Sequence, residues 1–326
     1  MAQTASEQTG GHDDPHGRQA RYPTQIPKRG LRDVLLRIKD DVSAKSLGLI
    51  SAGTAFYSFL AIPSGIAALI ALYGLMFDPH QVEQQLTMLQ GVMPPQALDI
   101  VTEQLKALTG QPRKALGVSF AISLGVALWS ANSATTSLMT ALNVVYEERE
   151  KRNLFRYYAT ALGITASAIV FAVVSLMLIA ILPAVIDLLP LGDFSRTLTT
   201  VLRWPALMFL FVLGLGVGFR FAPSREKPKW RWLSWGAFLA VILWIVASAL
   251  FSLYASHFPS YEKTYGSLAG VVLLLMWLYF SAYAILIGAE LNAELEHQTT
   301  QDSTTGPEKP MGQRGATMAD TIGEER

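Results

Sequence analysis

The sequence contains no cysteine. Disulfide bonds, catalytic thiolates and cysteine-ligated metal sites are therefore excluded. The absence does not distinguish one cellular compartment from another, because it says nothing about the redox state that surrounds the chain.

Charged residues are also scarce. They make up 16% of the chain, whereas a soluble domain carries about 25%. Hydrophobic residues reach 51%, and the net charge is only +1. No strong positive field favours nucleic acid as a partner, and the composition instead indicates a membrane protein.

The common catalytic signatures are missing as well. The chain has no Gly-x-x-x-x-Gly-Lys-Ser/Thr loop for phosphates, no His-Glu-x-x-His metal pair and no Gly-x-Ser-x-Gly turn. Its five histidines are scattered and predict no metal cluster. We therefore expect no ATP-driven pump, no enzyme, no catalytic residue, no metal and no cofactor.

Long apolar runs are what the sequence does contain. A helix crosses the hydrocarbon layer with about 20 apolar residues, and backbone groups in lipid must be satisfied within the helix. The runs are too long and too uniformly apolar for barrel strands. The sequence predicts an all-α polytopic membrane protein with six transmembrane helices, at about 47–77, 115–146, 157–186, 197–219, 232–258 and 264–291.

The basic residues predict the orientation of these spans. Twenty of the 26 Lys and Arg residues lie in the N-terminal segment, the second and fourth connections and the C-terminal segment, and six lie in the other three connections. The positive-inside rule then places both termini in the cytoplasm.

The polar segments outside the spans receive separate predictions. Residues 1–30 and 297–326 lack an apolar period and are expected to be disordered cytoplasmic tails around a transmembrane domain at 31–296. No cleavable signal peptide is expected. Residues 31–46 have apolar residues at helical spacing among cations. They predict an amphipathic helix, either on the anionic leaflet or packed on the bundle. The long first external connection, 78–114, is expected to form short helices.

Three residues within the spans are candidates for function. Pro63 should kink or break the first span, because proline removes a backbone donor. Asn132 lies among small and hydroxylated residues and is either structural glue between helices or a substrate contact. Glu290 lies near the cytoplasmic end of the last span. It is expected either to pair with a basic residue such as Arg156 or Arg220, or to bind a coupling proton or cation.

The fifth external connection joins Tyr254 to Tyr265 and contains His257. Its tyrosines are typical of an aromatic belt at the membrane interface. The alternative is an external gate or binding mouth, in which His257 changes charge near neutral pH.

Three segments resemble the YihY, or virulence-factor BrkB, family of bacterial inner-membrane proteins. They are Ala-Phe-Tyr-Ser-Phe-Leu-Ala-Ile-Pro at 55–63, Leu-Trp-Ser at 128–130 with Ala-Leu-Asn-Val-Val-Tyr at 141–146, and a C-terminal block. That block includes Tyr-Gly-Ser-Leu at 265–268, Leu-Met-Trp-Leu-Tyr at 275–279 and Gly-Ala-Glu-Leu-Asn at 288–292. Polar residues of these segments, Tyr57, Asn143 and Asn292, join the candidate substrate or ion contacts.

The resemblance implies a six-helix protein of the bacterial inner membrane. Members once carried a ribonuclease BN label that is now regarded as misassigned, and some are linked to serum resistance or to lipid and lipopolysaccharide handling. The family has no agreed catalytic residues, so none are transferred.

Two functional hypotheses follow. The first is a transporter or lipid-translocating protein, with a phospholipid or lipopolysaccharide precursor as a possible partner. The second is a membrane scaffold that docks an envelope protein through residues 78–114. A ribonuclease is a remote third.

Overall fold

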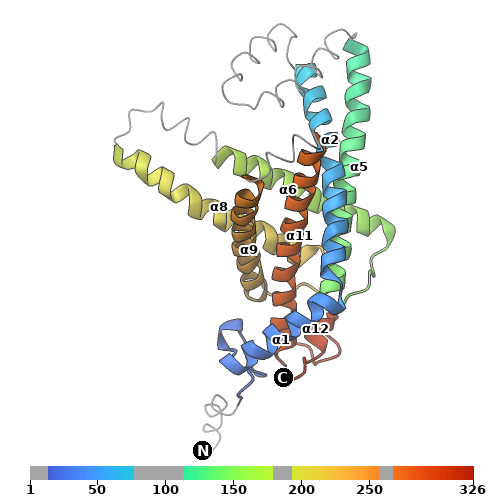
Figure 1. Ribbon diagram of the computed structural model, residues 1–326. Helices are drawn as coiled ribbons and strands as arrows, with labels where there is room; N and C mark the ends of the chain where they lie inside the picture. The colour runs from blue at the N-terminus through green and yellow to red at the C-terminus, as the bar shows by residue number, and fades with distance from the viewer. Residues whose placement is uncertain (1–13, 77–112, 179–192, 257–266) are drawn as a thin grey trace, which may run out of the picture. The chain divides into compact units, whose positions relative to one another are not determined.

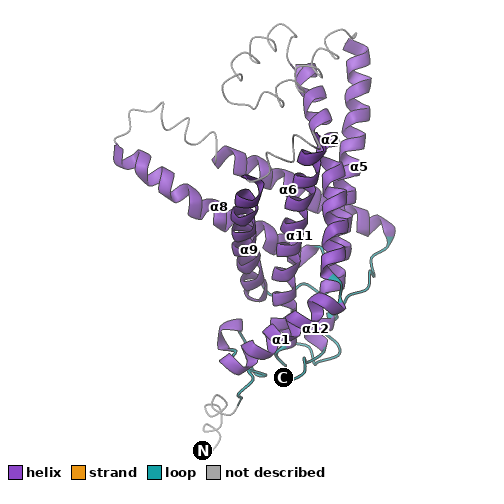
Figure 2. Cartoon of the chain, in the orientation of Figure 1, coloured by secondary structure: helices purple, strands orange, loops and turns teal. Residues whose placement is uncertain are grey.

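The computed structural model describes residues 14–76, 113–178, 193–256 and 267–326, and its ordered elements are helices (Figures 1 and 2). Within those ranges the only extended pairing is one isolated bridge between Pro228 and Thr304. The all-α prediction is confirmed. In chain order the helices are η1 (Pro23–Gln25), α1 (Lys28–Ala44), α2 (Leu47–Met76), α5 (Arg113–Val145), α6 (Leu154–Leu176), α8 (Asp193–Phe221), α9 (Trp230–Ser256), α11 (Ser267–His297) and α12 (Thr317–Asp320).

Each predicted apolar run overlaps one of the long helices α2, α5, α6, α8, α9 and α11. Four helices in the described ranges, α6, α8, α9 and α11, are long and apolar enough to cross a membrane. A fifth span results if α1 and the segment Leu47–Pro63, which meet at a bend of 64°, are counted as one. The chain is thus a helical membrane protein, and the count of six spans and the side of the termini stay predictions.

The chain forms two compact units. One contains residues 56–134, which include most of α2 and the first two thirds of α5, and the other contains the rest. In the smaller unit, α2 continues through Pro63, which lies inside the helix with an exposed side chain. A break in the helix at Pro63, one of the two outcomes expected from the sequence, is therefore not found.

Helices α9 and α11 pack closely in the larger unit (Figure 1). A Cβ at Gly236 would collide with the carbonyl oxygen of Gly288 and with the side chain of Asn292. A Cβ at Gly288 would in turn strike the carbonyl oxygen of Gly236 and the side chain of Ala240. The two backbones touch, as small residues allow between membrane helices.

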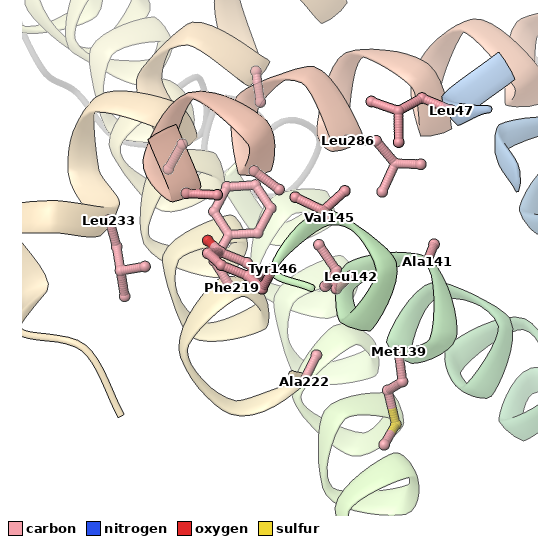
Figure 3. Close-up of a cluster of buried hydrophobic side chains, with 14 of the residues drawn as sticks. Leu47, Met139, Ala141, Leu142, Val145, Tyr146, Phe219, Ala222, Leu233 and Leu286 are labelled. Carbon is pink, nitrogen blue, oxygen red and sulfur yellow. The ribbon is translucent and has the colours of Figure 1, made fainter. Parts of the chain in front are cut away.

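A hydrophobic core lies where the end of α5 meets α8, α9 and α11 (Figure 3). Tyr146 and Phe219 are its largest fully buried aromatic side chains, and they lie beside each other in the close-up. Met318 of α12 belongs to the same cluster. The core therefore unites residues from both halves of the sequence with a helix in the C-terminal segment.

The described parts of the two terminal segments are folded onto this unit, which corrects the prediction of disordered tails. Gln298 donates a hydrogen bond to the carbonyl oxygen of His16 at 2.7 Å, and Thr299 donates to that of Ala20 at 2.7 Å. His16, which sequence reasoning placed in a flexible tail, contacts Asp33 at 2.6 Å. His12 lies outside the described residues.

Local side-chain bonds explain how so polar a C-terminal segment can be ordered. The guanidinium of Arg314 donates to the carbonyl oxygens of Thr300 and Ala319, each at 2.6 Å. Asp320 accepts the backbone N–H of Gly312 at 2.7 Å. Such hydrogen bonds can order a segment that has few apolar residues to bury. The polar composition of the segment suggested disorder because composition does not reveal these bonds.

Candidate ion-binding cluster at the end of α11

The last three turns of α11 contain three glutamates that are buried. Glu290, Glu294 and Glu296 are 0%, 1% and 0% exposed. A carboxylate near the C-terminus of a helix is opposed by the helix dipole, and a buried charge needs a partner. Cations from elsewhere in the chain must therefore approach this end of α11.

Lys45 supplies the first cation. It follows α1 directly, and its Nζ lies 2.7 Å from Oε1 of Glu290 and 3.1 Å from Oδ2 of Asp41. The same Nζ donates to the carbonyl oxygen of Val145 at 3.1 Å. Burial works against the charged ammonium, but the charges of Glu290 and Asp41 outweigh it and raise the pKa of Lys45 above its usual range. Lys45 is thus held as a cation among carboxylates.

The second carboxylate oxygen of Glu290 does not share the contact that Oε1 makes with Lys45. Oε2 is buried and has no hydrogen-bond partner among the described residues. Carboxylate oxygens of Asp41, Glu290 and Glu294 lie within 4.8 Å of one another. Oxygen ligands at such spacing suit a hard cation. Here the ammonium of Lys45 takes a cation's place beside two of the three groups.

Arg37 neutralises the next glutamate. Its Nε donates to Glu294, and its Nη2 donates to Oε1 of Gln298 at 2.7 Å. Another nitrogen, Nη1, donates to the carbonyl oxygen of Glu324 at 2.9 Å. This single side chain of α1 therefore connects α11 to the C-terminal segment.

Arg225, in the connection between α8 and α9, neutralises the third. Its Nη2 lies 2.5 Å from Oε2 of Glu296, which also accepts a hydrogen bond from Ser303 at 2.8 Å. The guanidinium covers the ring of Tyr146 at 4.8 Å from the centroid. The hydroxyl of Tyr146 and Oε1 of Glu296 are buried without a hydrogen-bond partner in the described chain. Glu290 and Glu296 each therefore keep one buried carboxylate oxygen without a hydrogen bond in the described chain.

The structure corrects the predicted partners of Glu290. Neither Arg156 nor Arg220 pairs with it: Arg220 donates to the carbonyl oxygen of Pro228 at 2.6 Å and covers the ring of Trp230 at 4.9 Å. The structural pairing itself is present, with Lys45 as the cation. Sequence reasoning missed Lys45 because the partners are 245 residues apart. One local signal was available, the spacing of four between Asp41 and Lys45.

Two predicted contact residues near the cluster are occupied by structural hydrogen bonds. Asn292 accepts the backbone N–H of Gly236 at 2.8 Å and donates to the carbonyl oxygen of Leu233 at 3.1 Å. Asn143 accepts the backbone N–H of Ser224 at 2.8 Å and donates to Glu150 at 3.0 Å. Both amides connect α9 or a loop to a neighbouring helix.

The other predicted contacts are not part of the cluster. In the smaller unit, Tyr57 is half exposed and packs edge-on against Phe56, while Asn132 has a buried Oδ1 without a hydrogen-bond partner in the described chain. Tyr254, near the end of α9, is half exposed, and the centroid of its ring lies 6.2 Å from that of Phe251. His257 and Tyr265 lie outside the described residues.

Comparison with known proteins places Lys45, Arg225 and the three glutamates inside a matched region. The family model described as virulence factor BrkB matches residues 38–312. A protein of Bacillus subtilis (strain 168) named YfkH, and described as ribonuclease-like, is 28% identical over 250 residues, which are 75% of this chain and 88% of that protein.

Two further relatives are UPF0761 membrane proteins. The one from Idiomarina loihiensis is 28% identical over 194 residues, 57% of this chain and 63% of the relative. The one from Pseudoalteromonas translucida is 27% identical over 218 residues, 64% of this chain and 67% of the relative. No solved structure matches.

Proposed function

The chain belongs to the virulence factor BrkB family of membrane proteins, and from this premise we propose that it is a transporter or lipid-translocating protein of the bacterial inner membrane. Both termini face the cytoplasm in this proposal. The substrate class that we propose is a phospholipid or a lipopolysaccharide precursor.

One observation supports this proposal above the others, the state of the Glu290 carboxylate. It is fully buried near the end of a long, mostly apolar helix, one oxygen contacts Lys45, and the other has no hydrogen bond within the described chain. Ionisable groups in membrane helices are costly and commonly mark ion or substrate pathways. A purely structural pair would gain more from satisfying both oxygens.

The position of Lys45 suggests how binding at Glu290 is coupled to movement. Lys45 lies between α1 and α2, and Glu290 lies on α11. A proton or cation that reaches Glu290 weakens the attraction to Lys45 and releases the α1–α2 connection from α11. A ligand shifts such a two-state equilibrium by its difference in affinity for the two states.

The test is lipid movement by the full-length chain in liposomes that contain a fluorescent phosphatidylglycerol, with dithionite added to bleach the outer leaflet. We expect the native chain to make more of the fluorescence accessible than empty liposomes do. Glu290→Gln should lose this activity yet stay folded, because Lys45 keeps Asp41 at 3.1 Å and Glu147 at 3.3 Å.

The matched control is Glu308→Gln, the same chemical change at an exposed glutamate; its activity should equal that of the native chain. For substrates without a fluorescent analogue, a thermal-shift screen covers lipid A precursors and sodium. A ligand at 100 times its dissociation constant adds about 2.7 kcal/mol of stability. No lipid movement and no thermal shift, in a protein that melts cooperatively, would contradict the proposal.

Two other hypotheses remain, a scaffold that docks an envelope protein and a ribonuclease, and the same preparations test the second. Docking of an envelope partner through residues 78–114 stays a prediction, since all but the last two residues of that segment lie outside the described residues. YfkH is named ribonuclease-like, but the acidic cluster here has glutamates that are 0% and 1% exposed, which leaves an RNA backbone no access. We expect the purified chain to leave RNA uncleaved.

A further inference from the structure

We propose that the outer face of α1 binds the surface of a membrane rich in anionic lipid. The proposal does not depend on transport. Helix α1 has two different faces. The inner face is buried and contains Asp33, Val34, Arg37 and Ile38. The outer face, called here the basic face, is exposed and contains Lys28, Arg29, Leu31, Arg32, Leu35 and Lys39.

The charges of the two faces are handled differently. On the inner face Asp33 pairs with His16, and Arg37 pairs with Glu294. The four cations of the basic face make no ion pair or side-chain hydrogen bond with any described residue. Asp40, the acid next to Lys39, forms its ion pair with Arg326. The basic face therefore presents four uncompensated positive charges, which complement anionic head groups.

Two leucines lie between these cations. Leu31 is 39% exposed and Leu35 is 62% exposed, one turn apart on the same face. In an interfacial helix the leucines enter the head-group boundary, while the long cationic side chains reach outward to the phosphates. A face built only to bind an acidic protein would not require exposed leucines in its centre.

The direction of α1 fits a helix that lies along the membrane surface. It turns by 64° from Leu47–Pro63 through a connection of only Lys45 and Ser46, and Ser46 has a left-handed φ of 52°. If Leu47–Pro63 enters the membrane, the 64° bend directs α1 away from the axis of that helix and keeps it close to the membrane surface. Eight of the 17 residues of α1 are charged, so α1 itself is unsuited to the hydrocarbon layer.

Aromatic residues indicate the same boundary on a neighbouring helix. Val34 and Ile38 of α1 share a buried cluster with Trp232 in the first turn of α9. In the first two turns of α9, Trp230 and Trp235 are half exposed. Tryptophan is enriched at the membrane–water interface. The start of α9 and the inner face of α1 therefore lie at the same depth relative to the membrane surface.

The absence of native cysteine makes a direct test possible. A single Leu35→Cys carries an environment-sensitive fluorophore in the full-length chain, reconstituted in nanodiscs of phosphatidylcholine with or without phosphatidylglycerol. The matched control is Met311→Cys, a half-exposed position in the C-terminal segment. In nanodiscs with phosphatidylglycerol, we expect a blue-shifted emission and quenching by brominated lipid tails at position 35 but not at position 311.

A second comparison isolates the charges. Replacing Lys28, Arg29, Arg32 and Lys39 together by glutamine should abolish the difference between the two lipid compositions at position 35. Exchanging Lys and Arg at the same four positions should preserve it. Equal quenching in both lipids would overturn the assignment to anionic lipid. A label that stays in water in both would overturn membrane binding altogether and point to a protein as the occupant.

Discussion

The two halves of α11 are held in opposite ways. Its first half is exposed along one side, with Leu268 and Val272 64% and 49% accessible, and it carries no charge. Its second half is almost completely enclosed and contains Glu290, Glu294 and Glu296. The exposed side of the first half requires only an apolar solvent. The second requires named cations, which come from α1, from the residue that follows α1 and from the connection between α8 and α9.

This contrast shows where specificity resides in the molecule. On the exposed side of the first half, any apolar side chain of similar size suffices, since lipid does not distinguish among them. The second half tolerates only one arrangement of Lys45, Arg37 and Arg225, since a buried carboxylate without its cation is strongly destabilising. The charged half therefore fixes which segments assemble around α11.

The largest predicted effect comes from removing the cation of the buried pair. Lys45→Met leaves Glu290 and Asp41 without their shared ammonium, and breaking a buried pair costs about 3–5 kcal/mol. We expect a large drop in the melting temperature of the detergent-solubilised protein. Lys45→Met combined with Glu290→Met should recover most of it, and failure to recover would show that the pair is not what Lys45 stabilises.

A smaller effect on stability is expected when a single methyl group is added to each half of α11. At Gly288 a Cβ would strike the backbone of α9, whereas at Gly270, in the first half, it meets nothing within 4 Å. Gly288→Ala should destabilise by about 1–3 kcal/mol through overpacking. Gly270→Ala should be neutral or stabilising by about 0.4–1 kcal/mol. Equal melting temperatures for the two variants would show that the close α9–α11 contact does not restrict the size of residue 288.

The smallest effect depends on pH and concerns a loop that meets the charged end. Burial disfavours the charge of Glu150, but hydrogen bonds from Arg152 and Asn143 lower the pKa of its carboxyl to about 2 from 4.5. Because the folded pKa is depressed, the stabilisation is complete above pH 4.5 and is lost as the pH falls toward 2.

The measurement is thermal stability as a function of pH. The native chain should lose more stability than Glu150→Gln between pH 5 and pH 3, by about 1 kcal/mol or less for a partly exposed pair. Glu308→Gln is the matched control and should follow the native curve. Parallel curves for the native chain and Glu150→Gln would contradict the assignment.

Local pattern was sufficient to predict the helices and insufficient to predict the cluster. The apolar runs identify α2, α5, α6, α8, α9 and α11, because lipid imposes the same demand on each of them. Glu290 was recognisable as unusual, since it is a carboxylate in such a run. Its partner was not, because Lys45 reaches it only when α1 turns across the end of α11.

The terminal segments show the same limit from another side. Their composition resembles that of disordered chains, yet Arg314 and Asp320 satisfy backbone groups of the C-terminal segment, and Met318 enters the core. Asn292 was found by resemblance and proved to connect two helices. In each case the deciding contact joins residues that no short window of sequence contains.

The long separation between Lys45 and Glu290 also bears on the order in which the protein is made. Synthesis runs from the N-terminus, so Arg37 and Lys45 exist long before the glutamates of α11 emerge. When the last long helix arrives, its counter-ions are already in place, and docking neutralises the carboxylates as they leave water. Until that moment the two cations have no glutamate of α11 to bind. A nascent chain that stops before α11 therefore lacks the glutamates that pair with Arg37 and Lys45 in the folded protein.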